Sequence, residues 1–231
     1  MIDKSKVLVW DVPTRVFHWL LALSFTGAFL TAESERYRDV HVLLGYTVLG
    51  LVAFRLLWGL VGTRYARFRS FAYRPHSVLT YVKSLFTRLP QHYVGHNPAG
   101  SWAVYALLAL SLLAGASGYA AYNDIGGHGM DDVHEALANT LLALVFVHIA
   151  GVVLSSLVHR ENLVGSMLNG YKFGKSGEGI RYRHRVIGGA LVAAVAALWI
   201  AGPDWLVAGW TPPGHAAAAV KYQSADRRHG D

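Results

Sequence analysis

The chain has 231 residues, of which 53% are hydrophobic and 15% are charged, and it carries a formal net charge of +7. Because soluble domains contain about a quarter charged residues, this composition excludes an ordinary soluble domain and indicates an integral membrane protein. The sequence has no cysteine, which excludes disulfides, iron–sulfur clusters and the covalent attachment of c-type haem.

Five apolar stretches are long enough to cross a bilayer, which takes about 20 residues of helix. They lie at residues 13–32, 41–61, 102–122, 134–157 and 186–206. The fifth stretch is the weakest, because Gly202 and Pro203 interrupt it. The first is too long in its apolar core for a cleaved signal peptide. We therefore predict an all-α integral membrane protein, with residues 1–231 forming a single membrane domain.

Charge between the stretches predicts the topology. The connection at 62–101 is basic and has no Asp or Glu, and residues 160–185 add further basic side chains, whereas residues 120–132 contain three Asp and no Lys or Arg. By the positive-inside rule, the N-terminus and both basic connections lie in the cytoplasm and the C-terminus lies outside. We expect a multi-pass membrane protein. Its basic charge reflects topology and predicts no nucleic-acid partner.

The connection at 62–101 is long enough to contain structure of its own. Its segment RPHSVLTYVKSLFTRL has Pro75 near the start and reads as an amphipathic helix on the cytoplasmic surface. The HNPAG segment then turns the chain into the third stretch.

Histidines indicate the chemistry. Five of the twelve lie in or beside predicted spans, namely His18, His41, His134, His148 and His159. His134 and His148 are 14 residues apart on one predicted helix, so they share a face and lie about 21 Å apart along its axis. That distance excludes one shared metal ion and suits two sites at different depths. The direction in which each predicted span enters the bilayer gives the depth of its histidines. By depth, His18 pairs with His148 on the inner side, and His41 pairs with His134 on the outer side.

Two bis-histidine sites between facing helices predict two non-covalent haems b in a four-helix transmembrane core, with a fifth transmembrane helix beside it. Small residues can let a flat ring approach the backbone, or can serve ordinary helix packing. They are Gly27, Gly45, Gly50, Gly118 and Gly151. His18 lies close to Arg15, whereas His148 lies well before Arg160. For these two histidines to lie at the same depth, either the first helix begins before Arg15 or the fourth continues into the cytoplasm.

Four segments together resemble the bacterial cytochrome b561 family, which includes the cytochrome b subunits of nickel–iron hydrogenases. They are RVFHW, HVLLG, HNPAG and VHEALANTLLALVFVHIAG, and the resemblance covers about residues 8–175. It implies a dihaem electron-transport cytochrome of a respiratory chain that exchanges electrons with the quinone pool. It also implies a bacterial inner membrane, with the C-terminus in the periplasm. The family's axial ligands to the haem iron fall on His18, His41, His134 and His148. The fifth span is similar to the hydrogenase-type branch, and the terminal DRRHG matches no pattern of the family.

The resemblance also implies partners and further site residues. Quinone and a periplasmic redox protein, such as a c-type cytochrome or a hydrogenase-like subunit, are the expected partners within the lipid bilayer, and a homodimer stays open. Arg55 and Arg15 can pair with haem propionates or extend to the cytoplasmic interface, the latter being favoured for Arg15. His96 and Asn97 can bind a quinone head group, or HNPAG can simply be a turn.

Three functions stay open at this point. The first is an electron-transfer cytochrome between quinone and a redox partner. The second is a quinol-dependent oxidase that acts on a small oxidant such as superoxide, so the sequence does not decide between an electron-transfer subunit and an oxidoreductase. The third is a haem-free, histidine-lined transporter of metal ions or protons.

Overall fold

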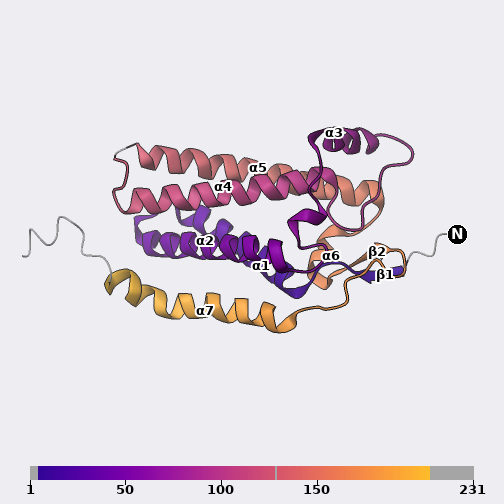
Figure 1. Cartoon of the computed structure of the whole chain (residues 1–231). Coiled ribbons are helices and arrows are strands. Elements are labelled where there is room, and N and C mark those ends of the chain that lie inside the picture. The colour runs from indigo at the N-terminus through magenta and orange to yellow at the C-terminus, as the bar shows by residue number, and fades with distance from the viewer. Residues whose placement is uncertain (1–4, 128, 209–231) are drawn as a thin grey trace, which may run out of the picture. The chain divides into compact units, whose positions relative to one another are not determined.

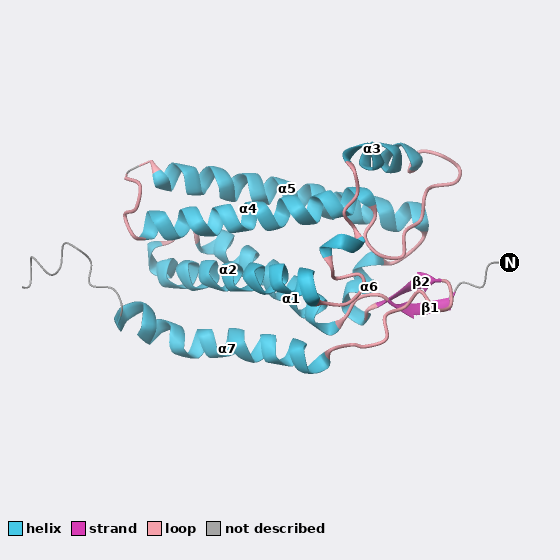
Figure 2. Cartoon of the chain, in the orientation of Figure 1, coloured by secondary structure: helices cyan, strands magenta, loops and turns pink. Residues whose placement is uncertain are grey.

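The computed structural model describes residues 5–127 and 129–208 of the chain, which divides into two compact units, Met1–Val192 and Ala193–Asp231. The elements, in chain order, are β1 (Ser5–Leu8), α1 (Val12–Thr31), α2 (Arg38–Val61), α3 (Pro75–Ser84), α4 (Pro98–Tyr122), α5 (Met130–His159), α6 (Leu163–Asn169), β2 (Tyr171–Gly174) and α7 (Arg185–Ala208). Figures 1 and 2 draw these elements along the chain. The C-terminal tail and its DRRHG segment lie outside the described residues.

Two helical hairpins form the membrane core of the first unit. α1 packs against α2, α4 packs against α5, and α2 contacts α4 to join the hairpins (Figure 1). α1 is shifted by one residue from its predicted stretch, and α2, α4 and α5 contain their predicted stretches completely. The all-α membrane fold is therefore confirmed.

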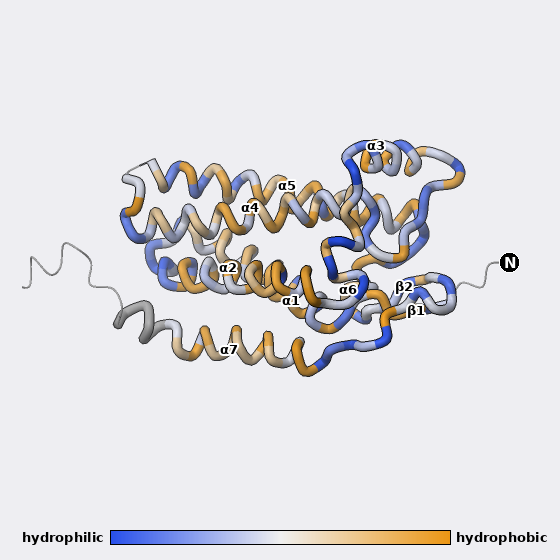
Figure 3. Tube along the Cα trace, in the orientation of Figure 1, coloured by the Kyte–Doolittle hydropathy of each residue, from blue (hydrophilic) through white to orange (hydrophobic). Residues whose placement is uncertain are grey.

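Four helical segments of the described residues are long and apolar enough to cross a membrane. They are Glu35–Val61, Pro98–Tyr122, Met130–His159 and Arg185–Gly202. Apolar residues dominate the traces of these helices, and hydrophilic ones gather in the connections (Figure 3). α1 has the 20 residues a span requires but is not among the four, because Arg15 and His18 reduce the hydropathy of its first half. The chain is a multi-pass membrane protein.

The helix boundaries meet the geometric condition set by the arginines. α1 begins at Val12, one turn before Arg15. α5 runs for 30 residues and ends at His159, with Arg160 in a left-handed conformation after it. The first alternative therefore holds, because α1 begins before Arg15, and His18 lies within electrostatic range of His148.

A small antiparallel sheet joins the N-terminal segment to the chain after α5. β1 pairs with β2 in the register Ser5↔Gly174 to Leu8↔Tyr171. Val9 N–H donates to the Gly170 carbonyl at 2.8 Å, which extends the contact beyond the strands. The sequence analysis missed this sheet, since each strand has only four residues and its partner lies more than 160 residues away.

The N-terminal strand and the two basic connections meet at one end of the helical core. The Tyr65 hydroxyl donates to the Glu178 carbonyl at 2.8 Å, and Lys172 Nζ donates to the Tyr93 carbonyl at 3.0 Å. α3 also packs at this end, with Tyr81 buried and Leu79 exposed. We call this end, formed by residues 5–11, 62–97 and 160–185, the basic end.

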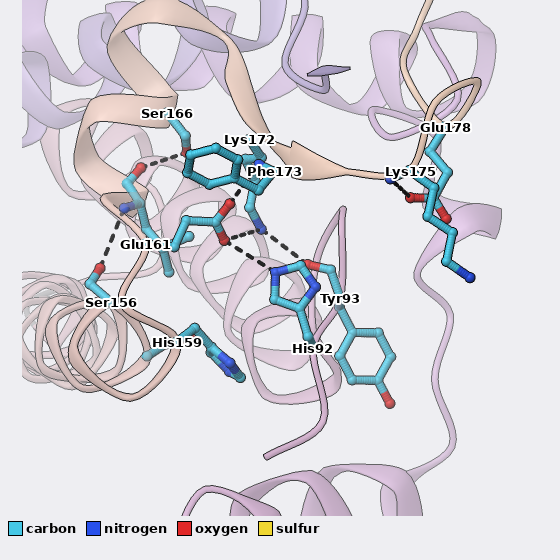
Figure 4. Close-up of polar contacts among 12 residues, drawn as sticks. His92, Tyr93, Ser156, His159, Glu161, Ser166, Lys172, Phe173, Lys175 and Glu178 are labelled. Atoms are coloured by element: carbon cyan, nitrogen blue, oxygen red, sulfur yellow. Dashed lines mark hydrogen bonds and ion pairs between the residues drawn. The ribbon is translucent and has the colours of Figure 1, made fainter. Parts of the chain in front are cut away.

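A buried carboxylate holds the basic end together. Glu161 accepts a hydrogen bond from Phe173 N–H at 3.0 Å and pairs with Lys172 Nζ at 3.4 Å and His92 Nε2 at 3.5 Å (Figure 4). Burial alone would raise the pKa of Glu161, but His92, Lys172 and the Phe173 N–H together lower it to about 2. Glu161 is therefore ionised throughout the neutral range. It joins the end of α5 to His92 in the connection before α4 and to Lys172 and Phe173 in strand β2.

Replacing Glu161 by Gln tests this role. The variant leaves Lys172 buried without its counter-charge, so we expect a loss of about 3 to 5 kcal/mol in stability. The measurement is the thermal unfolding midpoint in detergent. The double variant E161Q/K172M should recover most of the loss, and the exposed Lys175→Met is the matched control. A midpoint for E161Q equal to that of K175M would contradict the role.

Candidate functional site

Two histidines face each other at the end of the core opposite the basic end. The rings of His41 (α2) and His134 (α5) are 6.1 Å apart between centroids and nearly perpendicular, at 83°. Each Nδ1 bonds to a carbonyl of a neighbouring helix: His41 to Ala28 of α1 at 2.8 Å, and His134 to Ala114 of α4 at 2.9 Å. A carbonyl oxygen can only accept, so both Nδ1 atoms carry the proton and both Nε2 atoms keep a lone pair.

This arrangement is the one that metal-binding imidazoles adopt. A histidine that binds a metal through one nitrogen almost always donates the other N–H to a carbonyl, a carboxylate or water, which fixes the ring and its tautomer. In this structure all four helices of the core contribute, because two supply the rings and two supply the carbonyls.

A cavity of about 250 Å³ lies beside this histidine pair. Small residues line it, including Gly45, Gly115 and Gly118. A Cβ on Gly118 would come within 2.8 Å of the His134 ring, so only glycine lets that ring take its position. A Cβ on Gly45 would meet nothing within 4 Å, so α2 presents bare backbone to the cavity there.

The other three glycines considered for ring packing differ in their surroundings. A Cβ on Gly27 would lie 3.0 Å from Leu44 Cδ1, which is tighter than ordinary van der Waals contact, so Gly27 lets α1 and α2 approach closely. Gly50 and Gly151 have nothing within 4 Å of a Cβ.

The second histidine pair lies nearer the basic end. His18 (α1) and His148 (α5) are close enough to interact electrostatically, and both rings are half-buried. His18 Nδ1 is buried and has no hydrogen-bond partner among the described residues. The structure thus brings together both pairs expected from depth, but only the outer pair has backbone partners for its rings.

Some buried polar atoms of the described residues have no hydrogen-bond partner, and two of them belong to His18 and to His96, which lies within electrostatic range of His148. Among the described residues they are Thr14 Oγ1, Arg15 Nε, His18 Nδ1, Arg55 Nη1, Arg67 Nε and His96 Nδ1. Leaving such a group unpaired costs about 1 to 3 kcal/mol, and more where it is charged. The atoms include three guanidinium nitrogens, so this part of the molecule suits an anionic ligand.

Arg55 is the most buried of these cations. It is 2% exposed, its guanidinium lies 4.9 Å from the centre of the Phe68 ring, and it is within electrostatic range of Asp11. Arg15 is half-buried and lies within range of Asp11 and Arg183.

Asp11 is a site residue that the sequence analysis missed. Its Oδ1 accepts from Thr14 N–H at 2.8 Å and caps α1, while its Oδ2 accepts from Trp58 Nε1 at 3.1 Å and Thr63 Oγ1 at 2.6 Å. The local signal was present, since an Asp two residues before Pro13 is typical of a helix N-cap. Its contacts with α2 could not be inferred from that signal.

His96 and Asn97 lie at the start of α4, at the basic end. The His96 ring packs 4.3 Å from the Phe71 ring and 4.8 Å from the Trp10 ring, measured between centroids. Burial, with the nearby charges of Arg55 and Lys172, lowers the pKa of His96 to about 3, so the ring is neutral. Asn97 Oδ1 accepts from Gly100 N–H at 2.7 Å, so the HNPAG segment does form a helix cap.

Comparisons with known proteins identify a family for this chain. The family model for prokaryotic cytochrome b561 matches residues 9–170. A probable Ni/Fe-hydrogenase B-type cytochrome subunit of Rhizobium leguminosarum is 25% identical, over 77% of this chain and 93% of its own length. The corresponding Azotobacter vinelandii subunit is 25% identical over 74% and 90%. The probable Ni/Fe-hydrogenase 1 subunit of Escherichia coli K12 is 24% identical over 72% and 92%. No solved structure gives a significant match.

The matched region contains all four core helices and both histidine pairs. Because the family model covers most of the chain, this protein belongs to the prokaryotic cytochrome b561 family and is a b-type cytochrome of electron transfer.

Proposed function

We propose that this protein is a dihaem cytochrome b of a bacterial inner membrane that transfers electrons between the quinone pool and a periplasmic redox partner. The partner class is hydrogenase-like, since the relatives are named as hydrogenase cytochrome subunits. In this proposal the basic end faces the cytoplasm, as the positive-inside rule favours. Membership of a cytochrome family argues against a haem-free transporter.

The observation that carries the proposal is the geometry of His41 and His134. The two rings are 6.1 Å apart between centroids, and both Nδ1–H groups are bonded to carbonyls, which leaves both Nε2 lone pairs free to bind a metal ion. His41 and His134 would hold the iron of one haem b, beside the glycine-lined cavity. When bound, a haem b supplies one-electron redox chemistry.

His18 and His148 are the proposed ligands of the second haem. They lie at the level of the buried cations, and the unpartnered nitrogens of Arg55 and Arg15 suit the carboxylates of haem propionates. Because His134 and His148 are four helical turns apart on α5, the two ligand pairs lie at different depths of the bilayer. Electrons can therefore cross the membrane within this one chain.

His96 and Asn97 are the proposed quinone-binding residues at the cytoplasmic side. A quinone head group needs hydrogen-bond donors, and neutral His96 has a buried Nδ1 without a partner among the described residues. His96 also lies within electrostatic range of His148, so the proposed quinone and the inner haem would be neighbours.

Histidine variants test the haem pairs. We expect two acid-extractable haems b per purified chain, and His41→Ala and His134→Ala should each leave one, the inner haem. His18→Ala and His148→Ala should each leave the outer one. The measurements are haem extraction with quantification and reduced-minus-oxidised spectra. The control is His76→Ala, at an exposed position of α3.

The pairing has a clear contrary result. If His18→Ala and His41→Ala remove the same spectral component, the two-pair arrangement is wrong. A wild-type chain that binds a single haem would contradict the dihaem proposal itself.

A variant of His96 tests the quinone site. His96→Ala should keep both haem spectra and slow haem reduction by a short-chain quinol by about tenfold or more, since the loss of a hydrogen-bonding and proton-exchanging group weakens both binding and reaction. Stopped-flow absorbance measures the rate, with His76→Ala as the control. Unchanged kinetics with intact spectra would move the quinone site to the outer haem.

A further inference from the structure

The proposed quinone site creates a demand for protons. Reducing one quinone to quinol takes two electrons, which the b haems supply, and two protons, which must come from water. Neutral His96 packs between Trp10 and Phe71, so it has no direct role in bringing protons from the surface. A series of groups that exchange protons is needed between the surface of the basic end and the start of α4.

Tyr81 of α3 provides a buried hydroxyl at that position. Its side chain is 2% exposed, and its hydroxyl lies 3.3 Å from Ser155 Oγ and 3.5 Å from His159 Nε2 on α5. The hydroxyl also interacts with the side chain of Asn97. Burial raises the pKa of Tyr81, which keeps the phenol protonated and able to accept one proton while it donates another.

Two histidines connect Tyr81 to the surface. The rings of His159 and His92 are in edge contact, with centroids 5.6 Å apart. The side chain of His92 is 32% exposed, and its Nε2 lies 3.5 Å from the buried carboxylate of Glu161, which holds the ring in place beside His159 (Figure 4). Imidazole exchanges protons at neutral pH more readily than any other side chain.

These contacts run in one direction, from a partly exposed ring to a fully buried hydroxyl. His92 comes from the connection before α4, His159 from the end of α5 and Tyr81 from α3, so three separate segments contribute. Helix packing alone would not require three proton-exchanging side chains in sequence, because apolar side chains of similar size would fill the same space.

We propose that His92, His159 and the Tyr81 hydroxyl form a proton-transfer route from the aqueous surface of the basic end to the quinone at His96 and Asn97. The inference rests on the proposed function. For each quinone reduced, two protons enter at His92 or His159, pass through the Tyr81 hydroxyl and bind the two quinone oxygens. In quinol oxidation the same route releases them.

The experiment separates electron transfer from proton transfer in the haem-loaded protein. Both haems are first reduced with dithionite, and the rate of their oxidation by a short-chain quinone is then followed in H₂O and D₂O. Tyr81→Phe and His159→Gln should slow this oxidation by about tenfold or more, as expected when a proton-transfer group is lost. They should also increase the solvent isotope effect while the haem spectra stay unchanged.

The matched control is Tyr65→Phe. Tyr65 also lies at the basic end. Its hydroxyl donates to the Glu178 carbonyl, which is not part of the proposed route. Its variant should oxidise at the wild-type rate, and so should all variants when the oxidant is a one-electron acceptor that takes no proton, such as ferricyanide.

Each outcome decides the inference. Wild-type rates of quinone-driven oxidation in both Tyr81→Phe and His159→Gln would overturn it, as would equal slowing with ferricyanide. If Tyr81→Phe disturbs haem binding, His159→Gln, at a half-exposed position, decides alone. A wild-type protein that quinone fails to oxidise would instead overturn the proposed quinone function, a result distinct from failure of the route.

Discussion

The buried carboxylate of Asp11 is the constraint on which the inner half of this molecule depends. It is 1% exposed and accepts hydrogen bonds from the start of α1, from Trp58 on α2 and from Thr63 just beyond that helix. One side chain thus sets where α1 begins and how it meets α2. Since Arg55 lies within its electrostatic range, Asp11 also balances a cation that would otherwise be costly to bury.

The two histidine pairs differ in the polar groups that surround their rings. At the outer pair, two carbonyls fix the tautomer of both rings, and Gly118 provides room for His134, so the ligand geometry is complete in the protein alone. At the inner pair, polar atoms of several cations are buried without partners, so the geometry favours a ligand with negative charge.

The basic end is a structure in its own right. The β1–β2 sheet, the contact of Tyr81 with Ser155 and the pairing of His92 with Glu161 each connect segments that are more than 60 residues apart. Its contacts also hold His96 within electrostatic range of His148. The connections of this cytochrome therefore contribute to the site, in addition to linking its membrane helices.

The sequence by itself determined the helices and singled out four histidines as candidate ligands. Hydrophobic length predicts the spans, and the 14-residue spacing on α5 predicts two sites on one face, because both follow from local helix geometry. The tertiary structure alone decided which carbonyls hold His41 and His134, how β1 finds β2, and that Arg55 is buried beside Asp11. Those contacts join residues distant in the chain, and no local pattern encodes which distant group will satisfy a buried donor or acceptor.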